Sequence, residues 1–327
     1  MDLRQLGTSD LRISPIGIGA WAMGGGKWDW GWGSQNDYDS LRAIYEGLET
    51  GLNWIDTAAV YGLGHSEMII GRAIKNMPDR PYIFTKCSLV WDESGRISHS
   101  LQAASIRREL EGSLKRLGVE QVDLYQVHWP AWNGAPENAS PGSIEEAVCA
   151  LAEMQREGKI RYLGVSNFDS EQVKRALSIT PIVSLQPHYS LLARDAEDSV
   201  LPFAKQNSLG VIVYSPMYSG FLSGAMTSGR IAHFPEDDWR KRNPNFKEPL
   251  LSRNLRLVET LRSIGQRCNM RPGEVAIAWT LRNPAVTAAI VGVRTAQLVR
   301  GIAGAAWSCL GAAEAAEIDH SLNSVAA

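Results

Sequence analysis

Cysteine is scarce in this sequence, and its placement argues against two kinds of site. The four cysteines, Cys87, Cys149, Cys268 and Cys309, lie far apart, with no C-x-x-C spacing and no His-x-His partner among 327 residues. Neither a structural zinc site nor a disulfide framework fits that pattern. We therefore expect no bound metal, reduced thiols and a cytoplasmic location.

An excess of charge of one sign is also missing. The chain has 33 Lys and Arg against 35 Asp and Glu, which gives a formal net charge of -2. A nucleic-acid-binding protein normally carries a basic surface, so we expect no nucleic-acid partner. The sequence has no run of about 18 apolar residues, and its first residues are charged where a signal peptide is apolar, so we expect no membrane partner.

Two glycine-rich nucleotide-binding motifs are absent where they would be expected. The first strand-to-helix turn has glycines at Gly17, Gly19 and 24–26, which do not match G-x-G-x-x-G, and Gly26 and Lys27 are followed by Trp28 rather than Ser or Thr. A doubly wound dinucleotide-binding sheet is therefore the second choice of fold, and a phosphate-binding P-loop is not indicated.

The sequence does have a regular alternation of short apolar strands and amphipathic helices. Strands are predicted over residues 15–19, 53–56, 82–86, 123–128, 162–166, 183–186, 211–214 and 289–291. Eight strands, most followed by a helix, predict an α/β fold, namely a (β/α)8 TIM barrel formed by residues 1–327 as a single domain. Residues 3–6 and 11–13 predict an N-terminal hairpin that covers the barrel floor, and long loops are expected at the other face.

Polar or small residues recur where these strands end. They are Asp56, Lys86, His128, Ser166, Asn167, Gln186, Tyr214, Ser215 and Gly292. Each residue alone could have a purely structural role, but active sites of TIM barrels are built at the carboxyl ends of the strands. Their shared position predicts an active site there.

Four of the residues near this face suggest proton transfer. Tyr61 follows the Asp56 strand by five residues, and we expect Lys86 to lie near its phenol. A nearby cation would lower the tyrosine pKa from about 10, while Asp56 would keep Lys86 charged and His128 would position a carbonyl oxygen. The site has no nucleophile or metal ligand set, so a bound cofactor must supply the electrons.

These residues lie in motifs that resemble the aldo-keto reductase superfamily, in particular its bacterial NADP-dependent branch. The motifs are IDTAAVYGLGHSE, FTK, DLYQVHWP, GKIRYLGVSNF, VIVYSP and IVGVR, spread over essentially the full length. The resemblance implies a catalytic tetrad of Asp56, Tyr61, Lys86 and His128. It implies reversible NADPH-dependent reduction of an aldehyde or ketone to an alcohol, with tyrosine as the general acid and base. The alternative is a cofactor-binding, redox-sensing regulatory subunit with little turnover.

The same resemblance assigns residues to an NADP(H) site. It implies that Ser166, Asn167 and Gln186 bind the carboxamide, that Tyr214 stacks on the nicotinamide, and that Ser215, Met217, Leu222 and Gly224 hold the pyrophosphate. Gly292, Arg294 and Gln297 match the segment that binds the adenosine phosphate. That segment is one residue shorter than usual, and Gly301 stands where the family commonly has Asn.

Tryptophans are concentrated in the loops on the catalytic face. Trp28, Trp30 and Trp32 fall within five residues, and Trp21, Trp129 and Trp132 lie in loops after the first and fourth strands. We expect Trp21, Trp28, Trp30, Trp32 and Trp129 to form a wall for a small carbonyl or sugar substrate, and Trp91 to be a packing residue. The sequence leaves the oligomeric state open.

Overall fold

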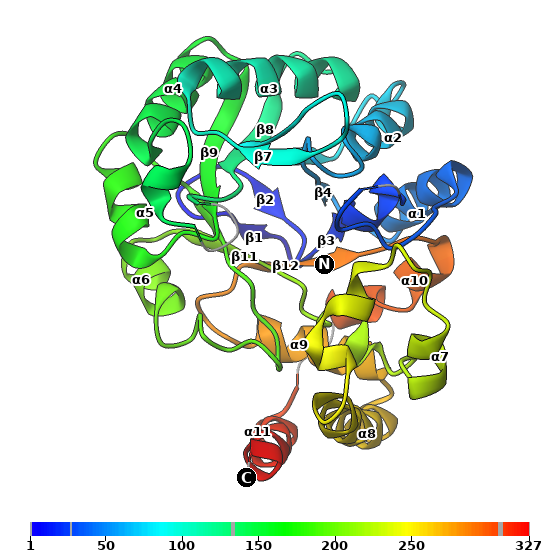
Figure 1. Ribbon diagram of the computed structural model, residues 1–327. Coiled ribbons are helices and arrows are strands. Elements are labelled where there is room, and N and C mark those ends of the chain that lie inside the picture. Colours follow the sequence, from blue (N-terminus) through cyan, green and yellow to red (C-terminus); the bar gives the residue numbers. More distant parts are fainter. Residues whose placement is uncertain (1, 27, 132–134, 307–309, 327) are drawn as a thin grey trace.

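The computed structural model describes residues 2–26, 28–131, 135–306 and 310–326. Its centre is a closed barrel of parallel strands in the order β10-β11-β12-β3-β4-β5-β8-β9. Figure 1 shows the helices arranged around these strands. The predicted (β/α)8 TIM barrel is therefore confirmed.

The barrel strands lie close to their predicted positions. They are β3 (Ile16–Gly19), β4 (Trp54–Asp56), β5 (Tyr82–Cys87), β8 (Val122–Val127), β9 (Ile160–Ser166), β10 (Ser184–Gln186), β11 (Gly210–Tyr214) and β12 (Ala288–Gly292). Most of their side chains are buried. Because both faces of a closed parallel sheet are covered, such strands are apolar almost throughout, which is why the sequence located them.

The helices follow the strands, and several begin and end where local signals place them. The larger ones are α1 (Asp37–Glu49), α2 (His65–Ile74), α3 (Ala103–Leu117), α4 (Ile144–Arg156), α5 (Ser170–Leu177), α6 (Val200–Gln206), α8 (Leu250–Cys268), α9 (Pro272–Leu281) and α11 (Ala312–Ala326). The side chain of Asp169 accepts from the backbone of Gln172 to cap α5, and left-handed Gly118 ends α3. Both arrangements are common at helix ends.

The floor of the barrel is covered by the predicted N-terminal hairpin. It consists of β1 (Arg4–Gln5) and β2 (Arg12–Ile13), and it crosses the middle of the barrel in Figure 1. Leu6, Leu11 and Ile13 are fully buried in one cluster with Trp54 and Phe84 of the strands. The hairpin therefore closes the end of the barrel opposite the carboxyl ends of the strands.

A second hairpin, on the rim, was not predicted. Strands β6 (Leu89–Trp91) and β7 (Ile97–His99) pair after β5. The Asp92 side chain accepts hydrogen bonds from the backbone of Ser94 and Arg96. The intervening Asp-Glu-Ser-Gly sequence is a turn signal between two short alternating segments, so the sequence contained the information.

The long segment between β11 and α8 is irregular, as predicted. It contains α7 (Ser228–Ala232) and three short 3-10 helices, at Phe221–Ser223, Trp239–Arg242 and Pro244–Phe246. The Trp239 amide donates to Gly31 O, and Arg242 donates to Asp29 O, so this segment is bound to the β3–α1 loop. In the described parts of the chain, no helix has the length and apolar character needed to cross a membrane.

Candidate active site

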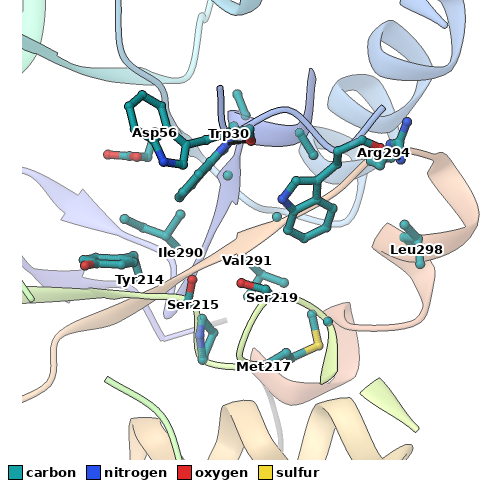
Figure 2. A pocket seen from close by; sticks show the side chains of 18 of the residues that line it. Trp30, Asp56, Tyr214, Ser215, Met217, Ser219, Ile290, Val291, Arg294 and Leu298 are labelled. Atoms are coloured by element: carbon teal, nitrogen blue, oxygen red, sulfur yellow. Dashed lines mark hydrogen bonds between the residues drawn. The ribbon is translucent and has the colours of Figure 1, made fainter. Parts of the chain in front are cut away.

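A cavity of about 780 Å³ opens at the carboxyl ends of the barrel strands. Figure 2 shows part of its lining. The sequence-predicted residues that line it are Trp21, Trp28, Trp30, Trp32, Asp56, Tyr61, His128, Trp129, Ser166, Asn167, Gln186, Tyr214, Ser215, Met217, Gly292, Arg294 and Gln297. Lys86 lies beneath the cavity surface, fully buried behind Asp56 and Tyr61.

The Lys86 ammonium is the centre of the polar cluster at the base of the cavity. Its Nζ lies 2.5 Å from Asp56 Oδ1, 2.8 Å from Thr57 O and 3.3 Å from Tyr61 Oη. An ammonium has three N–H donors, so these contacts use all of them. Because Lys86 donates to the phenol oxygen, the Tyr61 proton is not needed for that bond and remains available to another acceptor.

Burial disfavours the charged forms of both Asp56 and Lys86. Removal from water raises the pKa of Asp56 and lowers the pKa of Lys86, while their mutual attraction and hydrogen bonds oppose both shifts. The 2.5 Å contact and the full set of donors on Lys86 favour the charged pair. Removal of either partner would leave a buried charge without compensation.

The expected lowering of the Tyr61 pKa was wrong. Burial of the phenol, followed by the negative charge of Asp56 and an interaction with Tyr214, raises the pKa of Tyr61 well above its ordinary value. The ammonium does not offset this because it is already paired with Asp56 at a shorter distance. Tyr61 is therefore a protonated phenol at neutral pH, which is the form that can donate a proton.

His128 lies next to Tyr61 as a neutral imidazole. The two rings meet edge to face, with centroids 5.7 Å apart. Burial, and then the charge of Lys86, lower the pKa of His128 well below its ordinary value. A neutral imidazole still has one N–H donor, so His128 can donate to an oxygen without adding a second cation to the cluster.

Two glutamines support Asp56, and only one was predicted to belong to the site. Gln186 Nε2 donates to Asp56 Oδ2 at 2.9 Å, and Gln126 Nε2 lies 3.5 Å from the same oxygen. Gln126 was missed. A glutamine in the interior of a buried strand was the available signal, since a buried amide requires a polar partner.

Ser166, Asn167 and Tyr214 form a connected group on one side of the cavity. Tyr214 Oη donates to Asn167 Oδ1 at 2.8 Å, and Asn167 Nδ2 donates to His128 O at 2.9 Å. Asn167 has a φ of 61° and Ser215 a φ of 57°, both left-handed conformations that are uncommon outside glycine. Strained backbone of this kind is concentrated at functional sites.

Only some of the predicted cofactor-binding residues after β11 line the cavity. Ser215 and Met217 line the cavity, as do Ser219, Gly220 and Ser223. Leu222 is fully buried in the core, and Gly224 packs against Pro272, so the structure does not place either one at the cavity surface. Leu222 and Gly224 thus shape the loop from behind.

Four arginines line the cavity, of which only Arg294 was predicted. This arginine group consists of Arg230, Arg240, Arg271 and Arg294. Gly301 also lies here, and a Cβ at that position would overlap the Arg271 guanidinium. An Asn at position 301 would therefore require the Arg271 side chain to move.

Arg240 is held rigidly within this group. Its guanidinium lies between the rings of Trp32 and Phe234, at 4.3 and 4.2 Å from their centroids, and it makes several hydrogen bonds to Asp238. Arg240 and Asp238 are both buried. Trp32 is therefore a contact between the β3–α1 loop and the loop after β11.

Arg294 is bound to the β3–α1 loop. Its Nε donates to Gln35 Oε1 at 2.6 Å, and its terminal nitrogens donate to Trp32 O and Ser34 O. Gln35 Nε2 donates back to Arg294 O at 2.8 Å. These contacts use three of the five N–H donors of the guanidinium and leave two for a ligand.

Four other tryptophans of the cavity lining lie around Tyr61. The aromatic wall, defined as Trp21, Trp28, Trp30 and Trp129, belongs to or packs on one apolar cluster that includes the Tyr61 ring. Trp21 stacks on Tyr61 with centroids 5.7 Å apart. This approach is possible because Gly24 and Gly62 meet backbone to backbone, where a Cβ on either residue would overlap the other.

Two more tryptophans, Trp91 and Trp239, are not part of the aromatic wall. Trp91 contacts Arg116, with 5.8 Å between the guanidinium carbon and the ring, which agrees with the predicted packing role. Trp239, which was not predicted, stacks on Trp21 at 6.2 Å. Trp132 lies outside the described residues.

Comparison with known proteins identifies the family of this chain. The sequence profile of the Aldo/keto reductase family matches residues 15–323. The chain is 36% identical to the aldo-keto reductase YhdN of Bacillus subtilis, over 90% of this chain and 85% of that protein. It is 32% identical to the NADH-specific methylglyoxal reductase of Escherichia coli, over 90% of each.

A solved structure is similar over nearly the whole chain. The glycerol dehydrogenase AKR11B4 from Gluconobacter oxydans superposes with a TM-score of 0.86 at 34% identity, covering 99% of this chain and 95% of that one. The family match and both alignments extend over most of the barrel. The chain therefore belongs to the aldo/keto reductase family.

Proposed function

We propose that this protein is an NADPH-dependent reductase of aldehydes or ketones, with Tyr61 as the general acid. The observation that supports this best is the Lys86 ammonium, which donates to Tyr61 Oη while Asp56 holds it from the other side. A phenol with its proton free, next to a paired ammonium, is suited to protonate a carbonyl oxygen. Other family members named for carbonyl or alcohol substrates include the methylglyoxal reductase and the glycerol dehydrogenase.

The proposed roles of the chain follow from these contacts. His128 donates its N–H to the carbonyl oxygen and orients it beside Tyr61. Tyr61 then transfers its proton to that oxygen, and the phenolate that results is stabilised by the hydrogen bond from Lys86. The aromatic wall excludes water from the reacting atoms. In the reverse direction, Tyr61 accepts the proton from an alcohol.

The lining of the cavity fits a nicotinamide dinucleotide phosphate. Its arginine group suits the phosphates of the dinucleotide, and Ser166, Asn167 and Tyr214 supply polar groups beside His128 for the carboxamide and the ring. At Gly292 a Cβ would meet no atom within 4 Å, so the backbone is open to a ligand. When bound, NADPH would supply the hydride.

A direct assay tests the proposal and its alternative. Oxidation of NADPH and of NADH would be followed by absorbance with a panel of aliphatic, aromatic and sugar carbonyls. Both cofactors are needed because one relative is named as NADH-specific. Turnover with NADPH supports the reductase, whereas tight cofactor binding without turnover of any carbonyl would favour a redox-sensing regulatory subunit.

We expect Arg294→Met to weaken NADPH binding by about tenfold or more and to leave NADH binding nearly unchanged. The two free donors of Arg294 can bind the 2′-phosphate, and a hydrogen bond to a charged group contributes roughly 1.5 to 3 kcal/mol. Dissociation constants for both cofactors, measured by fluorescence titration, check this. Gln35→Ala is the matched control because it removes the loop contact and keeps the arginine. Equal losses for the two cofactors in both variants would mean that Arg294 only holds the loop.

We expect Trp30→Ala to raise KM for bulky aromatic or sugar carbonyls several-fold more than for a three-carbon aldehyde. Trp30 is part of the aromatic wall, packed edge to face on Trp28 at 6.1 Å, and a small substrate would not reach it. Steady-state kinetics with both substrate sizes test this, with Trp91→Ala as the control outside the cavity lining. A similar change for large and small carbonyls would indicate that the ring is only a packing residue. Trp28→Ala would extend the test, whereas Trp32 faces Arg240 and should affect the loops instead.

A further inference from the structure

Ser88 lies between β5 and the rim hairpin, which is formed by β6 and β7. It follows Lys86 by two residues, is fully buried and has a φ of 83°, a left-handed conformation that is uncommon for residues other than glycine. Ser88 has no part in the proposed proton transfer. A strained backbone held in place beside a catalytic residue points to a further constraint at this position.

The Ser88 side chain binds both backbone groups of Trp129. Ser88 Oγ accepts from Trp129 N and donates to Trp129 O, both at 3.2 Å. His99 Nε2, from β7, lies 2.8 Å from the same oxygen, and because a carbonyl can only accept, the imidazole donates. Figure 1 shows β7 beside β8, the strand that ends just before His128. The start of the rim hairpin and its second strand therefore hold the backbone of one member of the aromatic wall.

Glu109 of α3 holds the backbone of Ser88. Ser88 is one residue beyond the end of β5, and its amide donates to Glu109 Oε2 at 2.9 Å. Ser105 Oγ donates to the other oxygen, Oε1, at 3.4 Å. Burial raises the pKa of Glu109 to about 8, so its side chain is a neutral acid at neutral pH. Because a buried amide needs an acceptor, this carboxyl group stabilises the left-handed conformation of Ser88.

His128 is held by different contacts. Its backbone N donates to Cys87 O at 3.0 Å, and Asn167 Nδ2 donates to its backbone oxygen at 2.9 Å. Neither contact involves the Ser88 side chain or Glu109. Loss of the Ser88 contacts should therefore displace Trp129 more than His128, and it should change substrate selection more than proton transfer.

We propose that Ser88, held by Glu109, is a positioning residue that fixes Trp129 and thereby favours ring-bearing carbonyl compounds over small ones. This inference rests on the proposed function, because it describes how the same site selects its substrate. Trp129 lines the cavity and packs on the apolar cluster that includes Tyr61. Neither Ser88 nor Glu109 is among the lining residues, so both act through Trp129. Selective sites require side chains whose positions are fixed by such supporting contacts.

Ser88→Gly tests the hydroxyl, and it should fold because glycine adopts the left-handed conformation without strain. The selectivity ratio is defined as kcat/KM for a bulky aromatic aldehyde divided by kcat/KM for a three-carbon aldehyde. We expect this ratio to fall at least about fivefold, mainly through KM of the aromatic aldehyde, because Trp129 loses two hydrogen bonds. The kcat for the three-carbon aldehyde should stay within about twofold of the wild-type value. An unchanged ratio would overturn the proposal.

A matched pair of changes tests the part of Glu109. Glu109→Gln keeps an oxygen acceptor for the Ser88 amide in a neutral group of the same shape as the protonated acid. Glu109→Met keeps an unbranched chain but has no such oxygen. We expect Glu109→Met to lower the selectivity ratio at least about threefold and Glu109→Gln to keep it within about twofold of the wild type. Equal ratios in the two variants would contradict the role of Glu109.

A measurement that needs no turnover distinguishes failure of this inference from failure of the proposed function. The full chain would be labelled with 5-fluorotryptophan, and the fluorine NMR signal of Trp129 would be identified by its absence in Trp129→Phe. We expect this signal to shift in Ser88→Gly and Glu109→Met and to keep its wild-type position in Glu109→Gln. If it does so while no carbonyl is turned over, the positioning of Trp129 is supported and the reductase proposal alone fails. A signal at the same position in all variants overturns the inference even in an active enzyme.

Discussion

Tyr61→Phe should lower kcat for aldehyde reduction by about 10²- to 10⁴-fold while leaving cofactor affinity close to that of the wild type. The substitution retains the ring that stacks on Trp21 and removes the hydroxyl that is 3.3 Å from Lys86 Nζ. Only the transferable proton and its oxygen are lost. Stopped-flow and steady-state rates with NADPH and an ordinary aldehyde would measure the effect, and a fluorescence titration would measure cofactor affinity.

The matched control is Tyr125→Phe, which removes a phenol hydroxyl from β8, outside the cavity lining. It should keep kcat near the wild-type value, and comparable rates in the two variants would rule out Tyr61 as the acid. The pH dependence adds an independent check. Because burial raises the pKa of Tyr61, its phenol stays protonated through neutrality, and deprotonation of this group should not reduce the rate between about pH 6 and about pH 9.

Lys86→Met should be the most damaging single change to the site, with effects on both rate and stability. Loss of the ammonium leaves the developing phenolate of Tyr61 without its donor, and removal of one such donor costs about 10²- to 10³-fold in kcat. It also leaves the buried Asp56 carboxylate unpaired, which typically costs about 3 to 5 kcal/mol of unfolding free energy. Denaturant unfolding at neutral pH would measure the second effect.

The double variant Asp56→Asn/Lys86→Met separates the two effects. Without the unpaired carboxylate, we expect most of the stability to return while the activity stays low. The pH dependence of the single variant has a definite sign, since burial raises the pKa of Asp56. Its stability deficit should be smallest at acid pH, where Asp56 is protonated in both states, and should grow as the pH rises above the unfolded pKa of about 4. A single variant as stable as the wild type near pH 7 would show that the pair is not a buried ion pair.

The sequence by itself determined the barrel and the order of its parts. Strands buried on both faces are mostly apolar, and the helices between them have one apolar face, so the alternation can be recognised along the chain. The position of Asp56 and Lys86 at strand ends follows from the same pattern, because all parallel strands end on one face. Local signals such as Asp169 with Gln172 placed the helix ends, since capping depends on residues only three apart.

Tertiary structure decided the properties that depend on residues far apart in the chain. The pKa of Tyr61 is raised by burial and then by the negative charge of Asp56, so the direction expected from residue types alone was wrong. The arginine group comes from three separate segments, and the Arg271 guanidinium lies against Gly301, where the family commonly has Asn. Likewise, Trp32 and Trp30 are two residues apart, yet Trp32 packs on Arg240 and Trp30 on the Tyr61 cluster. Packing between distant loops decides which of the two rings joins the Tyr61 cluster, and sequence spacing contains no information about it.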